Sequence, residues 1–274
     1  MDIKIEPVGY VISDYDNPAK MPLHGKSAII ELEPKYVEGL TRIEQNSHLW
    51  ILSWFHQANR DQLLTAPVRI DPKLPKFGVF SLRAPIRPNP IGLSLVEFDR
   101  VEGNRLYVSK FDAVDGTPIL DIKPYFQKDI VFSPETPDIR PATLEMKQDW
   151  FIEEALRHHQ ELCADLMIGV RMAVVADERL GKISNSDISL HVSGSACLID
   201  TLQGLSRARV ANPPRFSFEI LEAGVQADEA VYRSVWRKGE KALVITYIAP
   251  SIREKDAKSI GKMSVEELFS IQEM

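Results

Sequence analysis

The stretch from Arg83 to Ser94 combines charged and amide side chains with a stiff backbone. Its three prolines fix φ, so the polar groups around them lose little entropy when a ligand binds. An arginine fork suits a carboxylate or phosphate, and an asparagine can pair with an adenine edge. The stretch therefore favours a rigid loop for a nucleotide-like anion, with a structural corner carrying solvated arginines as the alternative. The candidate contact residues are Arg83, Arg87, Asn89, Ile91, Gly92 and Ser94.

Two further stretches carry side chains that can accept or donate a proton. Residues 112–125 place three aspartates, a lysine and a tyrosine in a short run in which Asp115 precedes a glycine, a turn signal. A hairpin with capping aspartates is the alternative to a catalytic role there. Residues 47–60 contain His48 and His56, an even number of positions apart, which places both on one face if a strand continues through them. Histidines in such strands are otherwise ordinary core groups.

The first 130 residues are dominated by short segments of strand length, separated by Gly, Pro and Asn. These segments are rich in β-branched and aromatic residues, and Gly103 with Asn104 marks a hairpin turn. Several short strands with few helical patterns predict a small closed or half-closed β-barrel. The expected strands are 8–13, 27–33, 49–55, 77–83, 93–101 and 105–111.

Three prolines within residues 133–142 predict an extended spacer and a domain boundary. Beyond the spacer the pattern becomes helical, with Gly181 expected as a left-handed cap and a capping box beginning at Ser264. We therefore expect an α+β protein, with a small β-barrel domain over residues 1–135 joined to an α+β domain over residues 142–274. The expected helices are 148–162, 166–180 and 198–205, and the expected buried strands are 216–221 and 243–248.

The composition limits the class of protein. The chain has 274 residues, 44% of them hydrophobic, which is enough for two cores without disulfides. No apolar run reaches the roughly 18 residues of a membrane span, and the N-terminus lacks the pattern of a signal peptide. We therefore expect no membrane association and a cytoplasmic location. A net charge of −6, spread evenly along the chain, gives no support to binding of a long phosphate backbone.

Residues 6–134 resemble the TrmO/YaeB (TsaA-like) family of methyltransferases. The most specific matches are Arg-Pro-Asn-Pro-Ile-Gly-Leu-Ser, residues 87–94, and the run Asp-Gly-Thr-Pro-Ile-Leu-Asp-Ile-Lys-Pro-Tyr, residues 115–125. The resemblance implies a β-barrel enzyme that binds S-adenosylmethionine near the interface of a homodimer. It further implies methyl transfer to N6 of threonylcarbamoyl-adenosine beside the tRNA anticodon.

The same resemblance suggests roles for individual residues. The cationic sulfonium is an activated donor that mainly needs positioning, but an amide-like nitrogen must also lose a proton. Asp115 and His56 are the candidates for taking that proton, and Arg83 is the candidate for the cofactor carboxylate or a substrate anion. The remaining expectations are Asn89 with the backbone of Ile91 and Gly92 at the adenosine, and an ion pair between Asp121 and Lys123 that shapes the pocket.

One departure from the family affects the acceptor. Where the family commonly has Pro-Arg-Gln-Gly, this chain has His24 in place of the glutamine. Three functions therefore stay open: a tRNA methyltransferase, a methyltransferase for a small molecule such as a thiol, an amine or a metal-bound ligand, and a non-catalytic sensor of S-adenosylmethionine or a metal. Transfer of labelled methyl groups to tRNA, or to a small product, separates these alternatives.

The second half of the chain resembles a different family, that of the E-type subunit of formylmethanofuran dehydrogenase. The similar runs are residues 159–173 and 195–203, and both cysteines of the chain fall at the family's cysteine positions. His159 and Cys163 are four residues apart, so on one helix they would face the same way. Together with Cys197, and with Glu161 or Asp200, they form a possible ligand set for zinc or a similar ion. Small buried thiols are the alternative.

Overall fold

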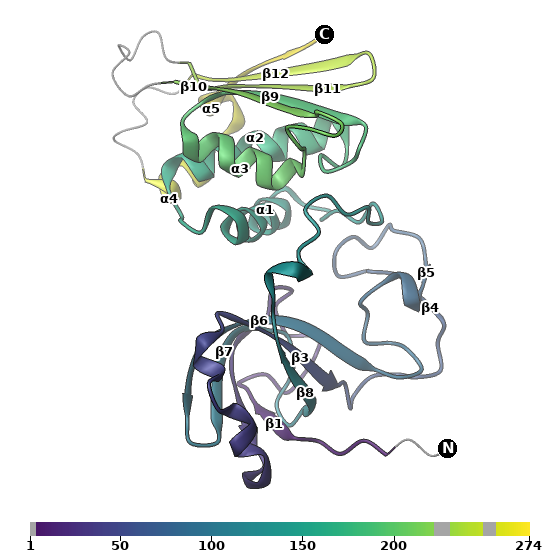
Figure 1. The fold of residues 1–274 in the computed structure, drawn as a ribbon. Coiled ribbons are helices and arrows are strands. Elements are labelled where there is room, and N and C mark those ends of the chain that lie inside the picture. Colours follow the sequence, from purple (N-terminus) through teal and green to yellow (C-terminus); the bar gives the residue numbers. More distant parts are fainter. Residues whose placement is uncertain (1–3, 222–230, 249–255) are drawn as a thin grey trace. The chain divides into compact units, whose positions relative to one another are not determined.

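The computed structural model describes residues 4–221, 231–248 and 256–274. These residues form two compact units, each with its own hydrophobic core. The first unit contains the chain up to Val68 and Lys73–Ile130, and the second contains Arg69–Pro72 and Val131–Met274 (Figure 1). The expected domains, 1–135 and 142–274, stay a prediction. Among the described residues, no helix is both long and apolar enough to cross a membrane.

The first unit is a closed antiparallel barrel, as the sequence predicts (Figure 1). Side chains alternate between its inside and its outside, so that in β3 every second residue is buried. Ile30, Ile51 and Leu106 are fully buried and belong to the barrel core. In barrel order the strands are β1 (Gly9–Ile12), β2 (Lys26–Leu32), β7 (Arg105–Phe111), β6 (Ile91–Glu102), β3 (His48–Trp54) and β8 (Pro118–Pro124).

Strand β8 was not among the strands expected from the sequence. Asp115 and Gly116 form the turn as expected, with a left-handed φ of +70° at Gly116. The chain then enters a seven-residue strand that begins with Pro118 and ends with Pro124. Proline is tolerated at strand ends, because few ladder hydrogen bonds are lost there. The turn-rich appearance of the sequence therefore concealed the strand that closes the barrel.

A long segment between β3 and β6 contains only short elements. The prediction of a strand over residues 77–83 is wrong beyond its first two residues, because the chain passes from β5 into a 3₁₀ turn, η3. The Arg87 side chain donates hydrogen bonds to the carbonyl groups of Val79 and Leu82. These carbonyls would otherwise pair with a neighbouring strand. The short elements are β4 (Leu64–Thr65), β5 (Phe77–Gly78) and η3 (Val79–Ser81); the other 3₁₀ turns of this unit are η1 (Pro34–Leu40), η2 (Ile43–Gln45) and η4 (Gln127–Asp129).

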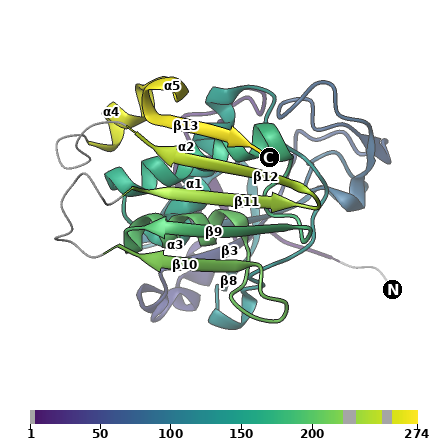
Figure 2. The ribbon, with the colours of Figure 1, turned by 90° about the horizontal axis from the view of Figure 1, so that it is seen from above.

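The second unit is a five-stranded sheet with helices on one face (Figures 1 and 2). Helices α2 and α3 lie against the sheet, and α1 packs on them from the other side. The three expected helices are confirmed with shifted ends. The helices are α1 (Leu144–His159), α2 (Ala164–Leu180), α3 (Ala196–Ser206), α4 (Ala257–Lys262) and α5 (Val265–Leu268); in sheet order the strands are β10 (Phe216–Ile220), β9 (Ile188–Gly194), β11 (Arg233–Lys238), β12 (Lys241–Tyr247) and β13 (Phe269–Glu273).

Three local expectations in this unit have different outcomes. The capping box from Ser264 to Glu267 is confirmed at the start of α5. The strand expected as buried over residues 216–221 is mostly exposed, because among the described strands β10 lies at the edge of the sheet and has β9 as its one neighbour. Gly181 ends α2 with φ +81° but ψ −166°, so it is not a left-handed helical cap. Glycine still suits this position because φ is positive.

Candidate functional site

Several predicted site residues converge at one end of the barrel. Neighbouring strands are antiparallel, so the ends of β1, β3 and β7 lie at the same rim as the starts of β6 and β8. The loops at this rim contain the proline-framed loop, which is the loop part of residues 83–94. They also contain Asp115 and His56, the two candidate proton acceptors. We call this end the loop rim; its segments are residues 13–16, 55–60, 83–90 and 112–117.

The proline-framed loop is braced by hydrogen bonds from two arginines. Arg87 donates from Nε to the carbonyl of Ala84 at 2.8 Å and from Nη2 to the carbonyl of Val79 at 3.0 Å, with a further bond to Leu82. Arg60 donates from Nε to the carbonyl of Pro88 at 2.8 Å. The loop is therefore preorganised. Nε and Nη2 of Arg87 are committed to backbone carbonyls, which assigns this side chain a structural role.

Arg83 differs from Arg87 in its surroundings. It is exposed, and its guanidinium carbon lies 6.0 Å from the ring centre of Trp50 on the outer face of β3. Within the described part of the chain, no hydrogen bond or ion pair engages Arg83. Its donors are thus available to an anion, and the role expected for Arg83 stays a prediction.

The remaining candidate residues lie just before or at the start of β6. Asn89 is exposed, and its carbonyl accepts a hydrogen bond from the amide of Ile91 at 2.7 Å. Gly92 pairs with Ser53 so closely that a Cβ atom would lie 2.5 Å from the Ser53 hydroxyl oxygen. Ser94 donates its hydroxyl to Asp112 at 2.5 Å. Among the described residues, the buried Ser53 hydroxyl has no hydrogen-bond partner, and sequence reasoning did not single out this residue.

The two candidate proton acceptors lie beside the same segment, residues 13–16. Asp115 accepts a hydrogen bond from the amide of Ser13 at 3.0 Å. Gln57, the neighbour of His56, donates to the carbonyl of Asp16 at 3.1 Å. Strand β3 ends at Trp54, so the strand does not continue to His56, and the two histidines do not share a strand face. The segment 13–16 nevertheless links the loops of Asp115 and His56, and both side chains are exposed.

Asp121 and Lys123 form the expected ion pair, with 2.6 Å between carboxylate oxygen and ammonium nitrogen. They lie on β8 opposite Leu52 and Trp50 of β3, on the outer face of the barrel and away from the loop rim. Asp121 also lines a cavity of about 330 Å³. The structure therefore does not bring this pair together with Asp115.

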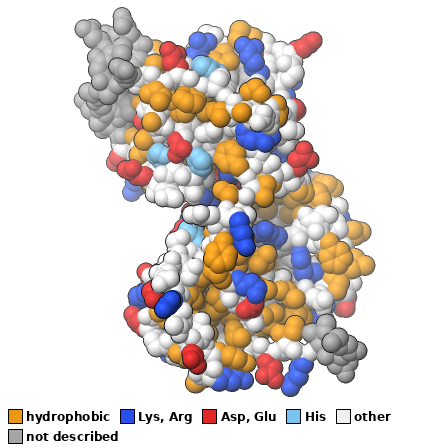
Figure 3. Space-filling model, viewed as in Figure 1, with side chains coloured by type: hydrophobic (Ala, Val, Ile, Leu, Met, Phe, Trp, Pro, Cys, Tyr) orange, Lys and Arg blue, Asp and Glu red, His pale blue; other side chains and the backbone are white. Residues whose placement is uncertain are grey.

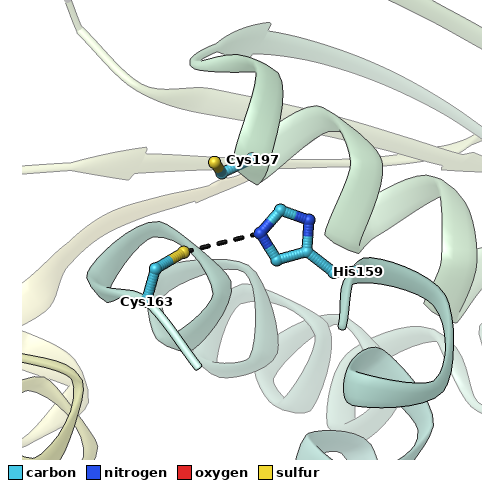
Figure 4. A group of neighbouring side chains, drawn as sticks. All are labelled: His159, Cys163 and Cys197. Carbon is cyan, nitrogen blue, oxygen red and sulfur yellow. Dashed lines mark hydrogen bonds between the residues drawn. The ribbon is translucent and has the colours of Figure 1, made fainter. Parts of the chain in front are cut away.

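In the second unit, His159, Cys163 and Cys197 form a cluster in which the potential ligand atoms all lie within 4.8 Å of one another (Figure 4). His159 and Cys163 do not share one helix, so the condition for their facing the same way by helical spacing is not met. His159 ends α1, Gln160 turns the chain with φ +66°, and Cys163 caps the start of α2. The turn, and not helical spacing, brings the two side chains together. Cys197 joins them from the first turn of α3.

The His159 ring has a defined orientation. Its Nδ1 lies 2.8 Å from a carboxylate oxygen of Asp200, and its Nε2 lies 3.6 Å from the Cys163 sulfur. Asp200 also approaches His158 at 3.0 Å. Asp200 thus contacts the ring at Nδ1, on the side away from the cysteines, while Nε2 faces the thiols. Glu161, the other expected additional ligand, is exposed outside the cluster.

The surroundings of Cys197 disfavour a free thiolate. Burial raises the pKa of Cys197 to about 11, with a further contribution from the neighbouring Cys163. Asp165 lies close enough to add to this effect. One Asp165 oxygen accepts from the Ser195 hydroxyl at 2.6 Å, and the other is buried without a partner among the described residues. A bound cation would stabilise the thiolate forms that this environment otherwise opposes.

Comparison with known proteins assigns the first unit to a family. The model of the tRNA-methyltransferase O N-terminal domain matches residues 10–129. A probable S-adenosyl-L-methionine-binding protein of Archaeoglobus fulgidus is 35% identical over 248 residues, which are 86% of this chain and 66% of that protein. A protein of the same description from Methanothermobacter thermautotrophicus is 42% identical over 131 residues, 46% of this chain and 93% of that protein.

Two further similarities involve named methyltransferases. The tRNA (adenine(37)-N6)-methyltransferase of Mus musculus is 38% identical over 136 residues, 44% of this chain and 30% of that protein. A crystal structure of TrmO is 25% identical, with a TM-score of 0.44 over 92% of this chain and 95% of that one. The family model confirms the resemblance to TrmO for residues 10–129, and the resemblance of the second half to formylmethanofuran dehydrogenase stays a prediction. On the family model and these sequence relatives, the chain belongs to the family of the tRNA-methyltransferase O N-terminal domain.

Proposed function

We propose that this protein is an S-adenosylmethionine-dependent methyltransferase that methylates N6 of threonylcarbamoyl-adenosine in tRNA. The observation that carries the proposal is the loop rim, where a braced loop meets the segments of Asp115 and His56. Relatives described as S-adenosyl-L-methionine-binding proteins support the methyl donor. The mouse relative, a tRNA (adenine(37)-N6)-methyltransferase, supports the acceptor.

In this proposal the protein mainly positions two reactants. S-adenosylmethionine would supply an activated methyl group, and the residues of the loop rim would hold it in line with the acceptor nitrogen, so that fixed geometry would lower the barrier. Arg83 binds the carboxylate of the methionine part, and Asn89 with the backbone of Ile91 and Gly92 binds the adenosine. Asp115 or His56 accepts the proton that the acceptor nitrogen loses.

Labelled S-adenosylmethionine tests the proposal directly. The protein is incubated with the labelled cofactor and bulk tRNA, and separately with a panel of small thiols and amines. Label in tRNA supports the proposal, and loss of most of that activity in Asp115→Asn or His56→Gln, by roughly 10²–10⁴-fold, identifies the proton acceptor. Label only in a small product contradicts the tRNA acceptor. Cofactor binding without turnover contradicts the enzyme and supports a sensor.

Methyl transfer to a small molecule is the second candidate function. It is favoured by the cluster of His159, Cys163 and Cys197 in the second unit, whose side chains are typical metal ligands. We propose that His159, Cys163 and Cys197 hold zinc or a similar ion. Thiolates and imidazoles are ligands that zinc prefers. A histidine that binds a metal often donates its other ring N–H to a carboxylate, as His159 could to Asp200. Three protein ligands leave a fourth position for an exogenous group, such as a thiol awaiting methylation.

Elemental analysis tests the metal centre independently of methyl transfer. The dialysed protein is expected to contain one equivalent of zinc or a similar ion, and Cys197→Ser is expected to contain much less. Asp149→Asn, an exposed position on α1, is the control that should retain the metal. Metal-free wild-type protein that does not take up added zinc contradicts the centre, whatever the methyltransferase assay shows.

We further propose that the protein is a cytoplasmic homodimer. Exposed apolar side chains on the outside of β1 and β6, among them Tyr10, Ile12 and Leu93, support an interface between copies. One chain has a mass of 31.0 kDa, and light scattering of the purified protein is expected to give twice that mass. A mass of one chain contradicts the dimer.

A further inference from the structure

Phe80 is the most exposed of the large hydrophobic side chains in the described part of the chain, at 83%. It sits at the centre of the turn η3, between residues that are firmly held. Val79 is buried at 1% exposure, and its amide donates to the carbonyl of Leu63 at 3.0 Å. Its carbonyl in turn accepts from Arg87. The backbone therefore fixes Phe80 outward, and the ring remains in solvent at the cost of its hydrophobic free energy.

The chain around Phe80 is locally basic although the protein is acidic overall. Residues 73–90 contain four Lys or Arg residues and no Asp or Glu, against a net charge of −6 for the whole chain. Arg83, three residues after Phe80, is exposed and lies over Trp50. On the surface of this unit in Figure 3, Lys and Arg side chains lie among hydrophobic ones. Phe80 thus projects from a positively charged segment.

The outer face of β3 continues this combination of aromatic and basic side chains. Trp50 and Trp54 are four residues apart in the strand, so both point outward. The guanidinium carbon of Arg60 lies 5.3 Å from the Trp54 ring, and that of Arg83 lies 6.0 Å from the Trp50 ring. We call Phe80, Trp50, Arg60 and Trp54 the aromatic–basic surface; Arg83 borders it and is assigned to the cofactor carboxylate. Rings for stacking and cations for phosphates are the two requirements of single-stranded nucleic acid binding.

We infer that the aromatic–basic surface binds unpaired nucleotides of single-stranded RNA, with Phe80 stacking on a base. This inference rests on the proposed tRNA acceptor, because a tRNA loop presents unstacked bases of this kind. A second copy of the chain fits the surface less well, since a twofold interface centred there would bring the same arginines together. The negative phosphates of RNA complement them.

The test compares Phe80→Ala with Phe80→Trp in the whole 274-residue chain. Affinity for bulk tRNA and for a fluorescent single-stranded oligoribonucleotide is measured by anisotropy. We expect Phe80→Ala to weaken both by about 5–150-fold, the equivalent of about 1–3 kcal/mol per stacked base, and Phe80→Trp to retain wild-type affinity. Leu63→Ala, an exposed apolar position between β3 and β6 but outside residues 73–90, is the control that should change nothing. Affinity for S-adenosylmethionine should be equal in all four proteins.

Other outcomes overturn the inference in distinguishable ways. If Phe80→Ala binds and methylates tRNA like the wild type, the stacking role is wrong and the proposed function stands. If the wild-type protein neither binds nor methylates tRNA, the proposed acceptor is wrong and the inference falls with it. If Phe80→Ala changes the mass in light scattering and leaves RNA affinity unchanged, Phe80 belongs to an interface between copies.

Discussion

The Nδ1 atom of His159 lies 2.8 Å from a carboxylate oxygen of Asp200, which turns its Nε2 toward Cys163. In metal centres, such a contact fixes the tautomer and orientation of the ligating imidazole. We therefore expect Asp200→Ala to weaken zinc affinity by roughly 10–100-fold. Competition with a chromophoric chelator measures the change. Asp149→Asn is the control, and equal zinc affinity in Asp200→Ala and wild type would show that Asp200 does not position the ligand.

The raised pKa of Cys197 predicts how the metal-free protein responds to alkaline pH. Its pKa rises from 9.0 to about 11 on folding, so the folded state favours the neutral thiol. The resulting stability is complete below about pH 9 and is lost as the pH rises through about 11. A shift of this size corresponds to about 3 kcal/mol for a shielded group, and we expect about 1 kcal/mol because Cys197 keeps contact with solvent.

Urea unfolding of the metal-free protein between pH 8 and pH 11 measures this loss. Cys197→Ser cannot ionise in this range, so the alkaline decline should be smaller by the same amount. Parallel declines in both proteins would contradict the contribution of Cys197.

The sequence predicted the barrel better than its closing strand. Alternating apolar residues around Ile30, Ile51 and Leu106 mark strands, because the barrel buries one face of each. Strand β8 lacked such a signal, since Pro118 and Pro124 at its ends resemble turn residues. Its pairing with β1 and β3 depends on partners that are distant in the chain.

In the candidate sites too, properties that depend on neighbouring residues could be predicted from the sequence, whereas contacts between residues distant in the chain could not. The stiffness of the proline-framed loop could be predicted from proline alone, but the capture of its carbonyls by Arg87 depends on tertiary geometry. The residues of the metal cluster were predicted, whereas their arrangement was not. Nothing in the spacing of His159 and Cys163 shows that Gln160 ends one helix between them.

Arg83 and Arg87 are expected to respond differently to truncation. Arg87→Ala removes three hydrogen bonds to backbone carbonyls, so we expect the barrel to lose about 1–3 kcal/mol of stability. Arg83→Ala should leave stability unchanged and weaken S-adenosylmethionine binding by roughly tenfold, since one charge-assisted contact is lost. Calorimetry measures both quantities. Equal losses of stability in the two variants would contradict this separation.

Gly92 is expected to tolerate no side chain. A Cβ atom there would lie 2.5 Å from both the Phe55 ring and the Ser53 hydroxyl oxygen. The amide of Phe55 donates to the carbonyl of Pro90, so displacement of Phe55 would disturb the proline-framed loop. We expect Gly92→Ala to cost about 1–3 kcal/mol and to weaken cofactor binding. Gly39→Ala is the control, because nothing lies within 4 Å of its Cβ position. Two variants of equal stability and affinity would contradict the packing argument.

Lys147 forms the most buried ion pair in the described part of the second unit. Its ammonium lies 2.7 Å from Asp177, and the two side chains are 5% and 2% exposed. Burial alone would lower the pKa of Lys147, but hydrogen bonds to Asp177 and Glu178 outweigh it and raise the pKa. The lysine therefore stays charged and compensates the buried carboxylate.

Replacing Lys147 with methionine keeps the packing volume and removes the charge. Asp177 then retains Arg140, at 3.4 Å, as its remaining cationic partner. We expect Lys147→Met to destabilise the second unit by about 3–5 kcal/mol, because an undercompensated carboxylate stays buried. Urea unfolding followed by circular dichroism measures the loss. Arg179→Ala breaks the exposed pair with Glu273 and should cost only about 0–1 kcal/mol. Similar losses in both variants would show that burial does not set the strength of these pairs.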